Sequence, residues 1–164
     1  MESTSKIRVY TAGIEKNGVG AYAYAVLEVT PGMRGGDVIN VRSRFAQAGP
    51  CKNDLRMKMR AFYEGIRHCP DGTEPEVLSD CYPIKEMLYN TNKYSENGDI
   101  AERFRQYILE HNVRPSFCLT DIYAEDDLPC DGHQECTWMV NNLCEEAIER
   151  YNETKRSYAK SFYS

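Results

Sequence analysis

The chain has 164 residues, of which 41% are hydrophobic and 27% charged, and its formal charge is −5. This length predicts one domain over residues 1–164 that buries a core without metals or disulfides, and the negative charge argues mildly against a polyanion-binding protein without excluding a local basic patch. No run of about 18 apolar residues occurs, which excludes a membrane-spanning helix, and the N-terminal MESTSKIRV lacks the apolar centre of a signal peptide, so we expect a cytoplasmic protein without membrane contact.

Three predicted strands open the chain. Apolar and polar positions alternate from Ile7 to Thr11 and predict a strand that ends in a turn at Ala12-Gly13. The second and third predicted strands span residues 21–29 and 38–47 and are bounded by turns that carry glycine or proline. Three consecutive strands joined by short turns indicate an antiparallel meander.

The hydrophobic period then becomes helical. Leu55, Met59, Phe62 and Ile66 predict a helix over residues 53–68, with Asp54 as its N-cap. The other predicted elements are a strand at 76–81, a short helix at 83–89, a helix at 100–111, an edge strand at 113–123 that contains Pro115, and a long helix at 136–158 that follows a polar loop at 124–135. This order predicts an α/β fold with a mixed five-stranded sheet.

Four stretches, taken in order, resemble motifs of the ribonuclease H family and the wider ribonuclease H-like superfamily. They are VYTAG with the following GVGAY (residues 9–13 and 18–22), NDLRMKMRA (53–61), VLSDCY (77–82) and VNNLC (140–144), which resemble the family's first strand and turn, first helix, fourth strand and last helix. The match covers roughly residues 6–150. It implies three antiparallel strands followed by two parallel strands, flanked by helices. Residues at about 151–164 extend past the family's minimal domain and are expected to form a C-terminal helical extension.

The resemblance implies a site in which four carboxylates hold two Mg²⁺ ions that cleave a phosphodiester. The matching positions hold Ala12, Lys58, Asp80 and Asn141, so one acid of the four remains. At an effective dielectric of about 20, an ammonium about 4 Å from each cation adds repulsion on the order of several kcal/mol. We therefore expect no catalytic residue, no metal and no cofactor, with Mg²⁺ required only if the domain is an active ribonuclease H. We also expect the Lys58 ammonium to lie near Asp80 as its counter-ion.

Residues before and within the last predicted helix offer two alternatives. His133 stands where the family often has a mobile catalytic histidine, and the acidic residues from Asp121 to Asp131 could replace lost ligands, but we favour a solvated acidic loop. Cys130, His133, Cys136 and Cys144 do not follow a common zinc-site spacing. The seven cysteines are an odd number and favour reduced thiols over a disulfide framework.

The first predicted helix is basic for so acidic a chain. Lys52, Arg56 and Arg60 are spaced by four and are expected to share one face, with Lys58 beside them. In the family that the sequence resembles, the start of this helix faces the nucleic-acid backbone. We interpret these four residues as a phosphate-contacting patch, with a solvated helix face as the alternative.

Aromatic residues support two further interpretations. Tyr22, Tyr24 and Trp138 are interpreted as packing residues rather than base-stacking platforms. Residues 151–164 intersperse aromatic and basic side chains, which either pack back on the domain or form a surface for a protein partner.

The favoured function is therefore a catalytically inactive ribonuclease H-like domain that binds nucleic acid, RNA/DNA hybrid or structured RNA, through its first helix. The alternative is a protein–protein interaction module, as an adaptor, inhibitor or assembly subunit, that acts through the C-terminal helix. A third reading is an active or engineered-inactive ribonuclease H endonuclease, because Asp to Ala and Asp to Asn are common laboratory substitutions in active sites.

Overall fold

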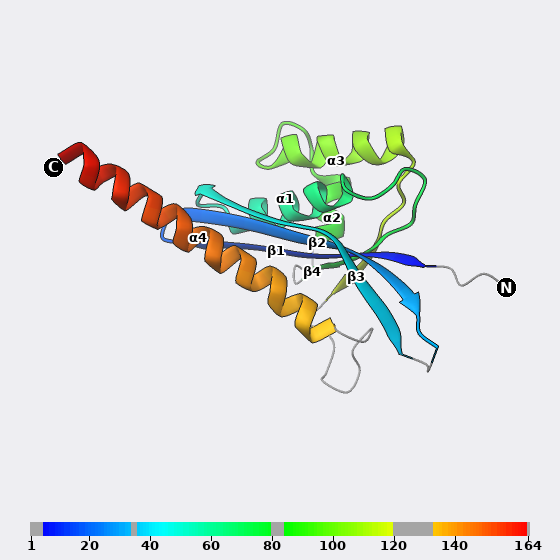
Figure 1. The fold of residues 1–164 in the computed structure, drawn as a ribbon. Helices are drawn as coiled ribbons and strands as arrows, with labels where there is room; N and C mark the ends of the chain where they lie inside the picture. Colours follow the sequence, from blue (N-terminus) through cyan, green and yellow to red (C-terminus); the bar gives the residue numbers. More distant parts are fainter. Residues whose placement is uncertain (1–4, 34–35, 80–83, 120–132, 164) are drawn as a thin grey trace.

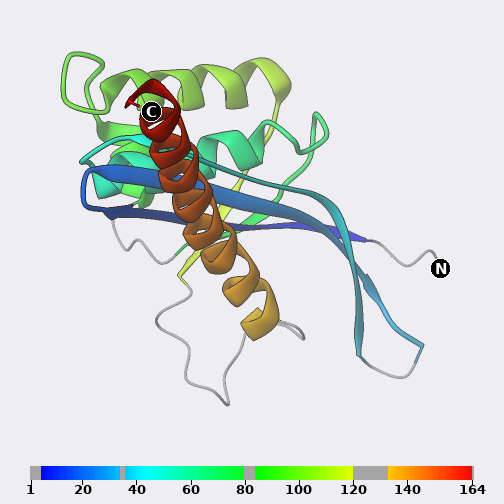
Figure 2. The ribbon, with the colours of Figure 1, turned by 60° about the vertical axis from the view of Figure 1, so that its left-hand side comes forward.

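A five-stranded sheet with helices on both faces forms the centre of the structure, a computed structural model that describes residues 5–33, 36–79, 84–119 and 133–163. In chain order the elements are β1 (Lys6–Lys16), β2 (Val19–Pro31), β3 (Asp37–Pro50), α1 (Asp54–Ile66), β4 (Glu76–Ser79), α2 (Ile84–Asn90), α3 (Gly98–His111), β5 (Ser116–Leu119) and α4 (His133–Tyr163). Figures 1 and 2 show α1, α2 and α3 on one face of the sheet and α4 crossing the other face.

The strand order across the sheet is β3-β2-β1-β4-β5. The first three strands pair antiparallel, whereas β4 is parallel to β1 and β5 is parallel to β4. This topology confirms the predicted α/β fold with a mixed sheet, and it confirms that β5 is an edge strand. It makes β1 the central strand, with α1 and α4 packed on its opposite faces.

The predicted turn at Ala12-Gly13 is wrong. Both residues lie within β1, where Ala12 pairs with Ala23 and Gly13 with Tyr22 of β2. The chain turns instead at Asn17 and Gly18, both of which have positive φ, as tight hairpin turns require. The first strand is longer than predicted because pairing along all of β2 outweighs the local turn signal of an Ala-Gly pair.

Helix ends differ from the prediction in ways that local hydrogen bonds explain. The N-cap of α1 is Asn53 rather than Asp54, since the Asn53 side chain accepts a hydrogen bond from the Arg56 amide at 2.9 Å. Asp54 becomes the first helical residue, where its negative charge favours the positive end of the helix dipole. At the other end of the chain, α4 begins at His133, inside the expected loop, and β5 begins after Pro115 rather than containing it.

Alternation along β1 and β2 sends side chains into two cores. Val9 and Tyr24 face α1, where they pack with Met59, Phe62 and Phe104, whereas Tyr10, Ala23 and Leu27 face α4, where they pack with Val140 and Cys144. Burying each large apolar side chain of these cores stabilises the fold by about 1.5–3 kcal/mol. Among the described residues, no helix has the length and apolarity that crossing a bilayer requires.

Candidate nucleic-acid interface

The candidate site lies where β1 and β4 part. These parallel strands pair from Arg8 and Glu76 up to Tyr10 and Leu78, and the Thr11 hydroxyl then donates a buried hydrogen bond of 2.9 Å to the Leu78 carbonyl. Beyond this point β1 leaves β4 and stays paired with β2 as far as their hairpin. In open α/β sheets, ligands bind at the carboxyl ends of parallel strands, so a binding site is expected among the elements around Ala12.

Ala12 is packed rather than exposed. Its side chain is 3% exposed and belongs to the apolar cluster between the sheet and α4, together with Ala23, Val140 and Cys144. The Cys144 thiol also donates a hydrogen bond of 3.5 Å to the Ala12 carbonyl. The position that matches the family's first carboxylate therefore forms part of a hydrophobic contact between β1 and α4.

Gly13 brings α1 into direct contact with β1. A Cβ at this position would lie 2.5 Å from the Met57 carbonyl carbon and 2.7 Å from the Lys58 Cα. Only a residue without a side chain allows this approach, since real Cβ atoms essentially never come so close to backbone. The Gly13 position therefore fixes the height of Lys58 above the centre of the sheet.

Lys58 points its ammonium at β1. Its Nζ donates a hydrogen bond of 2.7 Å to the Gly13 carbonyl, and it lies 3.5 Å from Asp54 Oδ2, one turn earlier in the helix. The side chain is only 16% exposed. A positive charge therefore stands at the second of the four positions that match the family's carboxylates, bonded to the residue that follows Ala12 in β1.

Of the other two matching positions, the structure describes Asn141 but not Asp80. The Asn141 amide donates a hydrogen bond of 2.9 Å to the Thr137 carbonyl of its own helix. Asp80 lies outside the described residues, so its expected contact with Lys58 stays a prediction. Mg²⁺ prefers oxygen ligands, and a buried methyl group and an ammonium do not fit it. A site with Ala12 and Lys58 therefore lacks the donors from which a two-metal centre is built.

The basic residues of α1 do not act as one face. Arg56 forms two hydrogen bonds with Asp99 of α3, at 2.8 and 2.7 Å, whereas the Arg60 guanidinium lies over the Tyr22 ring of β2, 4.7 Å from its centre. These two side chains therefore reach toward different neighbours, Arg56 toward α3 and Arg60 toward β2. Lys52 is exposed in the connection that precedes α1. A combined patch of Lys52, Arg56, Lys58 and Arg60 stays a prediction, with Arg56 already engaged by an acid.

The ion pair between Arg56 and Asp99 perturbs both groups. Hydrogen bonding to Arg56 lowers the pKa of Asp99 to about 2, and hydrogen bonding to Asp99 raises the pKa of Arg56. The pair links the first turn of α1 to that of α3, next to the Asn53 cap.

A polar cluster beside this pair was not identified from the sequence. The Asn53 amide donates hydrogen bonds to Glu96 Oε1 at 2.7 Å and to Asn97 Oδ1 at 3.4 Å, and Asn97 is 6% exposed with a positive φ of 65°. The sequence at this point is the Asn-Gly pair at 97–98. Its preference for left-handed backbone is the signal that marks Asn97 as the residue that begins α3.

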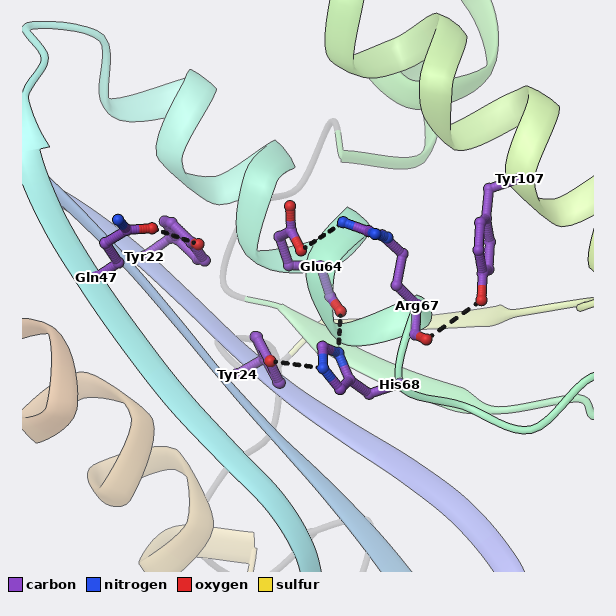
Figure 3. A network of polar contacts seen from close by, with 7 residues as sticks. All are labelled: Tyr22, Tyr24, Gln47, Glu64, Arg67, His68 and Tyr107. Carbon is purple, nitrogen blue, oxygen red and sulfur yellow. Dashed lines mark hydrogen bonds and ion pairs between the residues drawn. The ribbon is translucent and has the colours of Figure 1, made fainter.

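The opposite end of α1 holds a second polar network (Figure 3). The Tyr24 hydroxyl lies 3.2 Å from His68 Nε2, and His68 Nδ1 lies 2.9 Å from the Glu64 carbonyl. Tyr107 of α3 donates to the Arg67 carbonyl at 3.2 Å. Burial raises the pKa of Tyr24, and the whole network fastens the last turn of α1 to β2 and α3.

The aromatic predictions have mixed outcomes. Tyr22 and Tyr24 are 4% and 3% exposed and belong to the core under α1, which confirms them as packing residues. Trp138 is 58% exposed on α4, so its interpretation as a packing residue is wrong. The indole lies one helical turn before Asn141, on a helix whose buried face is made by smaller side chains.

The predicted acidic loop lies largely outside the described residues, as does Cys130. Cys136 and Cys144 are buried in α4. Within residues 5–33, 36–79, 84–119 and 133–163, no three His, Cys, Asp or Glu side chains converge as a metal site would require.

Comparison with solved structures identifies the fold as ribonuclease H-like. Ribonuclease H1 from the halophilic archaeon Halobacterium salinarum is 14% identical, with a TM-score of 0.56 over 88% of this chain and 98% of that one. The N-terminal ribonuclease H domain of Rv2228c from Mycobacterium tuberculosis is 11% identical, with a TM-score of 0.58 over 90% and 99%. The LC11 ribonuclease H1 isolated from compost, solved with an RNA/DNA hybrid, is 15% identical, with a TM-score of 0.52 over 87% and 99%. No protein-family model and no curated protein matches the sequence.

Proposed function

We propose that this domain binds nucleic acid, as RNA/DNA hybrid or structured RNA, without cleaving it. The observation that carries the proposal is the Lys58 ammonium, held 2.7 Å from the carbonyl of Gly13, the residue after Ala12, whose methyl group packs against α4. In place of metal ions, this site offers a fixed positive charge from the protein itself.

A lysine in this place supports binding. An ammonium attracts a phosphate oxygen as a point charge, and its anchorage to Gly13 reduces the side-chain entropy that the contact would otherwise cost. Lys52 adds a second, exposed cation in the connection before α1. A structure of similar fold has been solved in complex with an RNA/DNA hybrid, which supports a duplex as the ligand class.

The same residues argue against cleavage. Phosphodiester cleavage by two metal ions needs a bridging set of oxygen ligands, and the ammonium neither provides one nor tolerates a divalent cation beside it. Ala12 is in contact with α4 side chains, so a metal ligand cannot be regained there by a small shift. The domain keeps a charge that holds a phosphate and lacks the donors that would activate water.

The test is binding of labelled RNA/DNA hybrid, structured RNA and single strands, measured by fluorescence anisotropy across a salt series. We expect hybrid or structured RNA to bind, with Lys58→Gln weakening affinity about threefold to tenfold and reducing the salt slope by about one. Lys6→Gln removes the same charge from the far end of β1 and is expected to leave binding unchanged. No affinity at low salt, or equal effects of the two variants, would refute the proposal.

A second function is favoured by the length of α4. This helix continues to Tyr163, and Figure 1 shows its last turns projecting beyond the sheet. A helix without sheet beneath it is available to a protein partner, as an adaptor, inhibitor or assembly subunit. Loss of a partner on deletion of residues 152–164, with nucleic-acid binding retained, would establish this second function.

A further inference from the structure

The strand β3 forms an open edge of the sheet. It is one of the two outermost strands in the order β3-β2-β1-β4-β5 and is 14 residues long. Val41 and Phe45 are about half exposed along it, at 49% and 45%. An edge strand with unpaired backbone groups is a template for another strand, and proteins use it to bind extended segments.

The hydrogen bonds at the end of β3 show which backbone groups face outward. The Cys51 amide donates to the Gly18 carbonyl at 3.0 Å, which makes these residues a hydrogen-bonded pair. Hydrogen-bonded and non-hydrogen-bonded pairs alternate in an antiparallel ladder, and the register from Gly20–Gly49 to Ala25–Arg44 is unbroken. The backbone groups of Arg44, Ala46 and Ala48 therefore point away from β2, and Pro50, which has no amide hydrogen, occupies the next outward position.

A cavity adjoins this edge on the side of α1. It has a volume of about 180 Å³ and is lined by β3 residues from Gln47 to Pro50, together with Tyr22, Met57 and Arg60. Figure 3 shows Tyr22 and Gln47 projecting toward each other from β2 and β3 on this side of the sheet, and the Tyr22 hydroxyl donates to Gln47 at 3.0 Å. A side chain of a strand paired with β3 would lie next to this cavity, because side chains on one face of a sheet are neighbours across strands.

The charge around the edge is positive. Arg42 is paired with Glu28, but Arg44 and Arg60 lie within 4 Å of no carboxylate among the residues that the structure describes. Arg56 and Lys58 of α1, and Arg67 directly after it, each have such a partner. Arg60 is thus the unneutralised cation of α1, and it lines the cavity beside the edge.

We propose that the β3 edge and the Arg60 cavity bind an extended acidic segment of a partner protein. Its backbone would pair with Arg44, Ala46 and Ala48, and a carboxylate side chain would enter the cavity toward the Arg60 guanidinium. A second copy of this chain fits less well, because edge pairing would bring Arg44 and Arg60 of both chains to one interface, where like charges repel. This surface adjoins β2 and β3, whereas Arg56 pairs with Asp99 of α3. It does not depend on nucleic-acid binding through Lys58.

The first test uses an array of synthetic ten-residue peptides with acidic, neutral and basic compositions, alternating with Val and Thr. We expect the purified chain to bind acidic peptides about tenfold more tightly than neutral ones and to exclude basic ones. Binding of none of the peptides, or binding independent of their charge, would overturn the proposal. Sedimentation velocity on the chain alone is expected to show a monomer, and a dimer that Ala46→Pro dissociates would overturn it in favour of self-association.

Two variants then locate the bound peptide. Ala46→Pro removes an outward amide without touching the bonds to β2, and we expect it to weaken acidic-peptide binding about tenfold, while Ala46→Ser keeps it. Arg60→Gln is expected to weaken acidic peptides about fivefold and neutral peptides little. Circular dichroism and thermal unfolding of each variant verify the fold. Unchanged binding in a folded Ala46→Pro variant would show that the edge is not the docking site.

Discussion

Gly13→Ala is expected to disturb the fold and the Lys58 site together. The added Cβ would lie 2.5 Å from the Met57 carbonyl carbon and 2.7 Å from the Lys58 Cα, and still closer to the Lys58 amide nitrogen. All three are backbone atoms, so no side-chain rotation relieves the contact. Helix α1 has to move away from β1 by roughly the difference between these distances and an ordinary van der Waals contact distance of 3.4–4 Å.

The expected cost follows from how much α1 contributes. This helix buries Met59, Phe62 and Ile66 completely against the sheet and α3, so lifting it loosens the larger of the two cores. Overpacking of this kind costs about 1–3 kcal/mol, which corresponds to a fall in Tm of about 2–4 °C for each kcal/mol in a chain of this size. The same shift lengthens the hydrogen bond from Lys58 to Gly13.

Gly49→Ala is the matched control. It makes the same change within the same sheet, at a position where nothing lies within 4 Å of the added Cβ. We expect urea denaturation to give Gly49→Ala a free energy of unfolding within about 0.5 kcal/mol of the parent, or slightly higher, since alanine restricts the unfolded chain. Equal stabilities of the two variants would refute the close packing of α1 on β1.

Three further predictions concern charge and exposure. Because Arg56 lowers the pKa of Asp99 to about 2 from an ordinary 3.8, the pair stabilises the fold above pH 4 and loses this contribution as the pH falls toward 2. Arg56→Gln should abolish that part of the dependence of stability on pH in acid unfolding. An unchanged acid-unfolding profile would contradict the ion pair. Ala12→Asp should lower the free energy of unfolding by about 2 kcal/mol or more, with no recovery on adding Mg²⁺, because the carboxylate enters an apolar cluster; recovery of stability with Mg²⁺ would show a metal site. Cys69, buried and with its pKa raised to about 12, should resist alkylation in the native protein and react only on unfolding, as peptide mapping would show; labelling in the native state would place it at the surface.

Most of the fold could be predicted because hydrophobic period is a local property. The helical spacing of Met59, Phe62 and Ile66 and the alternation in β1 both identify their elements. The wrong predictions arise where contacts between elements distant in the sequence determine the local structure. The Ala12-Gly13 pair looks like a turn, but Gly13 serves the approach of α1, and only the neighbouring elements reveal that requirement.

For the candidate site, the sequence likewise predicts which residues matter but not which neighbours they contact. The positions of Ala12, Lys58 and Asn141 were identified in the sequence, yet the burial of Ala12 under α4 and the bond from Lys58 to Gly13 depend on how three elements pack. Spacing by four predicts that Arg56 and Arg60 share a face, but it does not say which neighbours attract them. The Arg56 side chain pairs with Asp99 of α3, whereas the Arg60 side chain lies over the Tyr22 ring of β2.

The most direct measurement of the central claim is the fate of a bound substrate. End-labelled RNA/DNA hybrid is incubated with excess protein in Mg²⁺ and in Mn²⁺, the shifted complex is recovered from a native gel, and its RNA strand is run under denaturing conditions. We predict a shifted complex whose RNA is full length in both metals, with less complex formed by Lys58→Gln. Shortened RNA in that complex would contradict the claim that Lys58 has replaced a metal centre.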